Sequence, residues 1–251
     1  MSRRLGQHFL RPAAVERLLE QIAPQPHDVF LEIGAGAGAL SLPLAARAER
    51  VVAVELDAAL TERLRARAPS NLSLVTGDAL TLDLATLVPP GARLVGNLPY
   101  YVSSPLLRRF LDLRARLRDA HLMLQEEVAL RVAAGPGSKA YGLLSVLYSL
   151  FTDVAVVLRL PPGAFEPPPK VRSAVICARF LSTPRAAVAN PLSFERFLKA
   201  AFAQRRRTLE NNLRDSYPNL KEYLRLLNIG EGRRAETLSV VEFAALAERL
   251  G

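Results

Sequence analysis

One short segment of the chain, Asn97-Leu98-Pro99-Tyr100, follows an apolar run and combines residue types that suit chemistry on a nucleobase amine. The exocyclic amine of adenine is a poor nucleophile because its lone pair is delocalised into the ring. If the side-chain oxygen of Asn97 and the carbonyl of Leu98 both accept from that amine, its nitrogen is drawn toward tetrahedral geometry. Pro99 fixes the backbone so that this carbonyl projects into a pocket. Tyr100 offers a face on which a flipped-out base can stack, a contact worth about 1–3 kcal/mol.

A glycine-rich loop lies upstream, where the apolar run 29–33 ends and a helix is expected to begin. The alternate glycines of 34–38 permit a tight turn and close approach to a ligand, and a helix N-terminus offers free N–H groups. Glu55 ends the next expected strand, where a carboxylate can accept from both hydroxyls of a ribose. Asp78 ends the third strand and suits an adenine amino group. Both acids lie at the ligand-binding edge of an open α/β sheet, which predicts a cofactor that contains adenosine.

Two cofactors are compatible with Glu55 and Asp78 in these positions, since NAD and S-adenosylmethionine both contain a ribose and an adenine. The Asn-x-Pro-Tyr segment at 97–100 separates them, because a dehydrogenase has no need for it at the end of its fourth strand. No strong general base is required, since a methylated cationic amine loses its proton readily, and no histidine is near in the sequence. The sequence therefore predicts S-adenosylmethionine as the cofactor and methyl transfer as the reaction.

Short β-type runs alternate with helical segments over residues 29–125, a pattern typical of βαβ units and a mainly parallel sheet. The expected strands are 29–33, 51–56, 72–75, 93–97 and 120–125, and the expected helices are 39–48, 57–67 and 103–115. Two further β-rich runs, 153–160 and 173–180, flank a proline-rich turn. We expect them to be the last strands of the same sheet in an α/β fold.

The pattern becomes helical after a proline-containing connection at 182–191. The expected helices are 193–204, 205–213, 219–227 and 239–250. We therefore expect a methyltransferase domain at 1–181 and a small all-helical RNA-binding domain at 182–251. The second has 12 basic and 8 acidic residues, a net charge of +4, and the first a net charge of +5, so the smaller domain is denser in positive charge. The residues expected to contact the RNA backbone are Arg205, Arg206, Arg207 and Arg214.

The composition bounds the class of protein. A net charge of +9 and an isoelectric point near 10.3 favour an anionic partner, with nucleic acid and an acidic membrane surface both open on charge alone. The single cysteine excludes an internal disulfide, and the three histidines are too scattered for a metal site. No segment has the length of a signal peptide core or a membrane span. We expect a cytoplasmic monomer without a metal ion.

Seven motifs, in order along the chain, resemble those of the rRNA adenine dimethyltransferases, in particular their bacterial KsgA/RsmA branch. They are GQHFL (6–10), LEIGAGAGALS (31–41), VVAVELD (51–57), TGDAL (76–80), VGNLPYYVSSPLL (95–107), FEPPPKVRSAV (165–175) and FAQRRRTLENNL (202–213). The resemblance implies a Rossmann-like class I methyltransferase fold with S-adenosylmethionine as methyl donor. It also implies dimethylation of the N6 amines of two adjacent adenosines near the 3′ end of 16S rRNA, within a small-subunit precursor.

The resemblance also implies roles for individual residues. The cofactor contacts would be His8, Leu10, Gly34, Gly36, Glu55, Asp78, Ala79 and Asn97, and the target adenine would be held by Asn97, Leu98, Pro99 and Tyr100, with Phe165 on its other face. The chain departs from the family in having His8 where Asn is usual and Ala35 where Pro is usual. A histidine can still donate a hydrogen bond to the methionine carboxylate of the cofactor.

Two alternatives remain within this resemblance. The resistance methyltransferases, which modify large-subunit rRNA, tend to have Ile where this chain has Leu98, and segments 135–146 and 165–175 look more like the small-subunit branch. A ribosome-assembly factor could keep the fold and bind RNA without catalysis. The intact set of Glu55, Asp78 and 97–100 argues against such a loss.

Overall fold

The computed structural model describes residues 8–250, which form two compact units. The first contains the chain up to Ala129 together with Val154–Phe180, and the second contains Leu130–Asp153 and the chain from Leu181 onward. The chain thus crosses between units at Phe180, next to the expected boundary at 182. It also crosses at each end of 130–153, a segment that the sequence analysis placed in the first domain.

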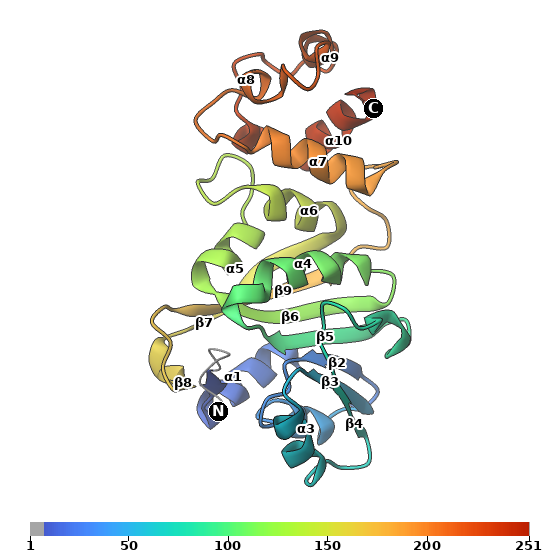
Figure 1. Cartoon of the computed structure of the whole chain (residues 1–251), viewed down its shortest axis with the longest axis vertical. Helices are drawn as coiled ribbons and strands as arrows, with labels where there is room; N and C mark the ends of the chain where they lie inside the picture. Colours follow the sequence, from blue (N-terminus) through green and yellow to red (C-terminus); the bar gives the residue numbers. More distant parts are fainter. Residues whose placement is uncertain (1–7, 251) are drawn as a thin grey trace. The chain divides into compact units, whose positions relative to one another are not determined.

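The first unit is built on a seven-stranded sheet with the order β4-β3-β2-β5-β6-β9-β7 (Figure 1). The strands are β2 (Val29–Ile33), β3 (Arg50–Glu55), β4 (Leu72–Thr76), β5 (Ala92–Asn97), β6 (Leu117–Gln125), β7 (Thr152–Leu160) and β9 (Ser173–Phe180). Strands β2 to β6 pair in parallel, and β9 pairs antiparallel with β6. This confirms the expected α/β fold and the place of the last two strands in the same sheet.

The strand order reverses at β2, because β3 lies on one side of it and β5 on the other. A ligand crevice forms outside the carboxyl ends of the strands at such a switch point. Register places Ile33, the last residue of β2, opposite Gly96 in β5. The glycine loop after β2 and the segment after β5 therefore begin side by side.

The helices of the first unit are α1 (Pro12–Ile22), α2 (Ser41–Ala45), α3 (Ala58–Arg65) and α4 (Ser103–Asp112), while α5 (Glu126–Val132) spans the change of unit. Helix α1 begins at a proline, which is favoured there because the first N–H of a helix has no partner. Its apolar residues at positions 15, 18, 19 and 22 have helical spacing and are buried. Strands β1 (Phe9–Leu10) and β8 (Phe165–Glu166) form a separate two-stranded antiparallel sheet.

The second unit consists mainly of α6 (Leu143–Phe151), α7 (Pro191–Ala201), α8 (Leu209–Leu213), α9 (Leu220–Leu226) and α10 (Val240–Leu250). Phe197 contacts Phe243 and Tyr217 with ring centroids 6.3 and 5.7 Å apart, and Phe202 contacts Phe243 at 5.5 Å. Helix α6 packs against α7 and α10. It is apolar on most of its circumference and needs partners on several sides, which explains why 130–153 joins this unit.

One expected helix, 205–213, is shorter in the structure. Helix α8 begins at Leu209 because the Thr208 side chain accepts from the N–H of Asn211 and caps it. Arg205, Arg206 and Arg207 therefore lie in the turn before α8, and the expectation that they are helical was wrong. Within residues 8–250, none of the helices has the length and apolar character that crossing a membrane requires.

Candidate active site

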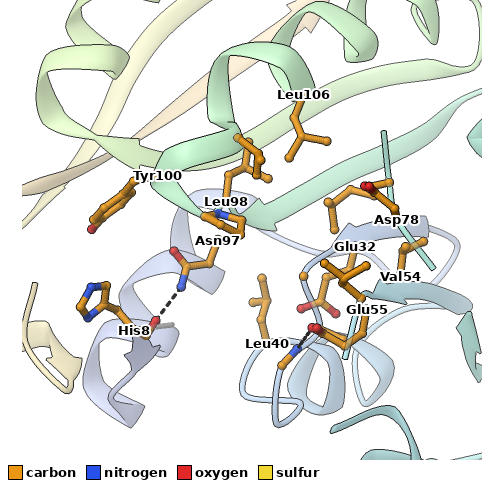
Figure 2. Close-up of a pocket in the computed structure, with 18 of the residues that line it drawn as sticks. His8, Glu32, Leu40, Val54, Glu55, Asp78, Asn97, Leu98, Tyr100 and Leu106 are labelled. Atoms are coloured by element: carbon orange, nitrogen blue, oxygen red, sulfur yellow. Dashed lines mark hydrogen bonds between the residues drawn. The ribbon is translucent and has the colours of Figure 1, made fainter. Parts of the chain in front are cut away.

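A cavity of about 230 Å³ lies in the first unit at the carboxyl ends of β2, β3, β4 and β5. Its lining comes from residues 8–10, 32–36, 39–40, 54–56, 77–80, 97–102 and 106. Figure 2 shows ten of these residues with labels, which come from separate segments of the first unit. Of the expected site residues, the structure brings together His8, Leu10, Gly34, Gly36, Glu55, Asp78, Ala79, Asn97, Leu98, Pro99 and Tyr100. Gly6 and Gln7 of the first motif lie outside the described residues.

The glycine loop turns sharply at the floor of this cavity. Gly34 and Gly36 have φ angles of 84° and 54°, in the left-handed region that favours glycine. A Cβ atom on Gly36 would lie 3.2 Å from the ring of Phe9, so a larger residue would also crowd β1. The N–H of Gly36 donates to Glu55 Oε2 at 2.7 Å, which ties the loop to the end of β3.

Glu55 is buried and its carboxylate is held in one orientation. Oε2 accepts from Gly36 and Oε1 accepts from the N–H of Asp57 at 3.0 Å. A carboxylate has about four lone-pair positions, so both oxygens retain acceptor capacity toward the cavity. Asp78 differs, since it is exposed and its Oδ1 accepts from the N–H of Leu80 at 2.8 Å. The two acids thus present fixed acceptors at neighbouring strand ends, as a ribose and an adenine require.

Glu32, in β2, is a cavity residue that sequence analysis missed. Its side chain is 2% exposed, and Oε2 has no hydrogen-bond partner in the described chain. Burial raises the pKa of Glu32 to about 8, the Ser41 hydroxyl opposes the rise, and the Glu55 carboxylate adds to it. Figure 2 shows the Glu32 and Glu55 carboxylates directed into the same part of the cavity. An unpaired acid in this place suits a cationic group of a ligand.

Asn97, at the end of β5, has a side chain whose orientation is set by the backbone of the N-terminal segment. Its Nδ2 donates to the carbonyl of His8 at 2.9 Å (Figure 2). A carbonyl only accepts, so the nitrogen of the Asn97 amide must face His8. Oδ1 is then available to accept a hydrogen bond from a ligand. The next residue, Leu98, is buried and donates its N–H to the carbonyl of Met123 at 3.1 Å. Hydrogen bonds to backbone carbonyls therefore hold both residues of the expected acceptor pair, Asn97 and Leu98, in place.

Tyr100 is partly buried, and its hydroxyl lies 2.8 Å from Ser173 Oγ in β9. Burial raises the pKa of Tyr100, and the Ser173 hydrogen bond opposes this. The His8 ring is stacked near it, with ring centroids 5.9 Å apart and planes at 30°. His8 Nδ1 donates to the carbonyl of Pro167 at 2.7 Å, so Nε2 of a neutral ring is an acceptor. Donation by His8 to a carboxylate would thus require its protonated form.

Phe165 is the expected site residue that the structure does not bring to the cavity. Its side chain is 1% exposed and packs in the hydrophobic core with Leu10, Val15 and Leu160. Its backbone pairs with Leu10 in the β1–β8 ladder. In this structure Phe165 supports the segment that carries His8, and it does not face a bound base.

The expected RNA-contacting arginines lie in the second unit, and their partners differ. Arg205 pairs with Glu236 at 2.9 Å, and Arg214 is 3.7 Å from Asp215. Arg206 and Arg207 are exposed in the turn before α8. Within residues 8–250, no group of three or more His, Cys, Asp or Glu side chains is arranged to hold a metal ion.

The model of one protein family, described as ribosomal RNA adenine dimethylase, matches residues 1–251. A relative from Syntrophotalea carbinolica, named ribosomal RNA small subunit methyltransferase A, is 45% identical over 98% of this chain and 95% of its own. A relative of the same name from Xylella fastidiosa is 44% identical over 96% of this chain and 93% of its own.

Two solved structures resemble the whole chain. A dimethyladenosine transferase from Plasmodium falciparum superimposes with a TM-score of 0.82 at 24% identity, covering 95% of this chain and 96% of that one. The 23S rRNA methyltransferase ErmE superimposes with a TM-score of 0.74 at 26% identity, covering 96% of this chain and 99% of that one. The fold is therefore that of the class I methyltransferases.

Proposed function

Since the chain belongs to the ribosomal RNA adenine dimethylase family, we propose that it transfers methyl groups from S-adenosylmethionine to two adjacent adenosines near the 3′ end of 16S rRNA. The enzyme is an rRNA adenine methyltransferase that serves small-subunit biogenesis. The observation that carries the proposal is the orientation of Asn97, whose Nδ2 is engaged by His8 so that Oδ1 is left to accept from an adenine N6 amine.

The residues of the cavity fit S-adenosylmethionine. Glu55 would accept from the ribose hydroxyls, and Asp78 with the neighbouring Ala79 would receive the adenine. Glu32 would pair with the ammonium of the methionine part, because its buried Oε2 lacks a partner in the described chain. When bound, the cofactor supplies an electrophilic methyl group on a cationic sulfur.

The target base would be held on the other side of the cavity. Asn97 Oδ1 and the Leu98 carbonyl would accept from the two hydrogens of the N6 amine, which localises its lone pair. Tyr100, fixed through Ser173, would stack on the flipped adenine. After transfer the amine is cationic and loses its proton readily, so the residues need to orient the amine more than to deprotonate it.

Identity and sequence support the small-subunit substrate. The relatives that are 44–45% identical over nearly the whole chain are named small subunit methyltransferases, whereas ErmE, at 26% identity, is a 23S rRNA methyltransferase. The chain also has Leu98, where the large-subunit enzymes tend to have Ile. Dimethylation of two adjacent adenosines goes beyond these names and is part of the proposal.

Methyl incorporation tests this function. Labelled S-adenosylmethionine is offered with unmodified small-subunit particles and, separately, with unmodified large-subunit particles. We expect label in small-subunit rRNA only, approaching four methyl groups per particle because two adenosines each accept two. Label in large-subunit RNA, or no label in either, would contradict the proposal.

A further inference from the structure

Two consecutive tyrosines line the cavity, and the proposed function gives a role only to the first. The Tyr100 ring is partly buried and its hydroxyl is held by Ser173. The Tyr101 side chain is 62% exposed. A single exposed aromatic is ordinary on a protein surface. Tyr101 differs because it is an exposed aromatic residue that lines the cavity, next to the residue expected to bind the target base.

The backbone beneath Tyr101 is held in place although the ring is in solvent. Both tyrosines belong to a 3₁₀ turn, Tyr100–Val102, which leads into α4 and packs against it. The N–H of Val102 donates to the carbonyl of Pro99 at 3.2 Å, and the buried Ser103 hydroxyl donates to the carbonyl of Tyr100 at 3.1 Å. An aromatic ring on such a support loses little freedom when it contacts a ligand.

The turn also sets the directions of the two rings. A 3₁₀ helix has three residues per turn, so consecutive side chains diverge by about 120°. Tyr100 and Tyr101 therefore offer separate faces from one support, and a single base cannot occupy both. The exposed Tyr101 is therefore available for an aromatic contact separate from the one assigned to the flipped adenine.

We propose that Tyr101 stacks on the nucleotide next to the flipped adenosine, so that consecutive tyrosines bind consecutive bases. This inference rests on the proposed function, in which the two substrate adenosines are adjacent. When one adenosine leaves the RNA stack, its neighbour loses a stacking partner, and an exposed aromatic face replaces it. The second adenosine is then held against Tyr101 at the cavity entrance while the first is methylated.

Three variants separate stacking from other roles of the ring. Tyr101→Phe keeps the aromatic face, Tyr101→Leu keeps apolar bulk without it, and Tyr101→Ala removes both. Each full-length variant is titrated with a small-subunit rRNA fragment that carries 2-aminopurine beside the target adenosine, on the 5′ side in one RNA and on the 3′ side in another. The fluorescence of 2-aminopurine is quenched by stacking, so it reports the contact directly. Cofactor affinity is measured in parallel by calorimetry.

With the parental enzyme and Tyr101→Phe, we expect quenching in one of the two RNAs. With Tyr101→Ala, we expect that quenching to be lost and RNA binding to weaken about tenfold, with Tyr101→Leu close to Ala and cofactor affinity within twofold of parental. The same quenching and RNA affinity in Tyr101→Ala would overturn the inference. So would a loss confined to cofactor affinity, which would assign the ring to covering the cofactor. Methyl incorporation by the parental enzyme tests the proposed function separately, since fluorescence quenching does not require transfer.

Discussion

At the scale of single residues, the site consists of acceptor atoms whose directions are set by hydrogen bonds to neighbouring backbone groups. Glu55 is oriented by two backbone N–H groups, and Asn97 is oriented by a backbone carbonyl that takes up its nitrogen. Such an arrangement is formed before any ligand binds, so little reorganisation is needed when the amine arrives.

Replacement of Asn97 tests the orienting role. We expect Asn97→Ala to reduce methyl transfer by roughly 100-fold or more, because a misplaced amine loses its alignment with the methyl group. Cofactor affinity should fall only modestly, since Asn97 acts mainly on the target. Single-turnover transfer and calorimetric cofactor binding measure the two effects. Near-normal transfer in the variant would disprove the role.

The raised pKa of Glu32 predicts a pH effect on cofactor binding. With a pKa of about 8, Glu32 is mostly protonated at pH 7 in the free protein, and pairing with an ammonium favours its ionised form. We therefore expect release of about one proton per bound cofactor at pH 7, and affinity that rises as pH increases from about 6 toward 8.

Calorimetry in buffers of different ionisation enthalpy counts the released protons. In Glu32→Gln, the proton release and the pH dependence below 8 should disappear. Glu62→Gln, on the surface of α3, provides a control with the same change in charge and should behave as the parental protein. Equal proton release in the parental protein and Glu32→Gln would show that another group titrates.

The positions of the site residues were predictable where the place within a strand was informative. Glu55 and Asn97 end strands and Asp78 follows one by two residues, and strand ends meet at the ligand-binding edge, so their convergence was predictable from the sequence. Glu32 lies inside the strand 29–33, where an acid gives no sign of whether it faces the cavity or the core. Phe165 was misplaced for a related reason, because an aromatic beside a proline-rich turn fits both a pocket and a core.

At the scale of secondary structure, a buried ionic cluster fixes α1 against the sheet. Arg93, in β5, donates to Asp119 at 2.9 Å and to Asp28 at 2.8 Å, and its Nη2 donates to the carbonyl of Ile22 at 2.7 Å. Burial alone would raise the pKa of Asp28, but hydrogen bonds from Gln25 and Arg93 bring the pKa below its usual value. The end of α1 is thus held at the opposite end of β5 from Asn97.

Removal of the Asp28 charge should lower stability in a pH-dependent way. The folded pKa of Asp28 lies below the unfolded value, so its contribution is present above the ordinary carboxyl range and lost as pH falls through the folded pKa. We expect Asp28→Asn to cost roughly 3 kcal/mol of unfolding free energy at pH 7, because Arg93 keeps its burial but loses one anion. Urea unfolding at pH 7 and pH 3 measures the difference, which should shrink at acid pH.

Asp112→Asn, at the exposed end of α4, is the control for the general effect of removing a carboxylate. It should change stability by less than about 0.5 kcal/mol at either pH. If Asp28→Asn is as harmless as this control at pH 7, the cluster does not stabilise the fold.

The hydrophobic pattern predicted helices and strands correctly where one face of the element is apolar. The prediction differed from the structure where a capping residue or the packing partners determine the element. The strands of the sheet were found within a few residues because their runs are apolar and end in glycine or polar residues. The helix at 205–213 was overextended, since Thr208 starts α8 by capping it. The segment 130–153, which the sequence analysis placed in the first domain, lies in the second unit because α6 packs against helices 40 or more residues away.

At the scale of the whole molecule, the chain combines a unit that contains the reaction site with a helical unit that is rich in arginine. We propose that the helical unit contacts the RNA backbone. Arg205 is paired with Glu236, so of the three consecutive arginines Arg206 and Arg207 are better placed for phosphate. Guanidinium groups bind phosphate in a bidentate way, which suits this role.

Salt titration tests that surface. Replacement of Arg205, Arg206 and Arg207 by alanine should weaken binding of unmodified small-subunit RNA and reduce the log–log salt slope by roughly one to two units, at about 0.7 to 0.9 per lost phosphate contact. Arg205→Ala alone should change the slope less, because that side chain already pairs with Glu236. Cofactor affinity is the control and should persist. Parental RNA affinity and slope in the triple variant would exclude this turn from the RNA interface.

The pairing of β1 with β8 affects when the reaction site forms during synthesis and folding of the chain. Phe9 is paired with Glu166, and the His8 carbonyl that orients Asn97 belongs to the same segment. During translation, residues 8–10 cannot pair with β8 until more than 150 further residues have been made. Contacts so distant along the chain form late, because closing a long loop precedes any gain from pairing. Residues 8–10 are thus among the last of the described residues to reach their place, and a nascent chain lacks a finished reaction site until then.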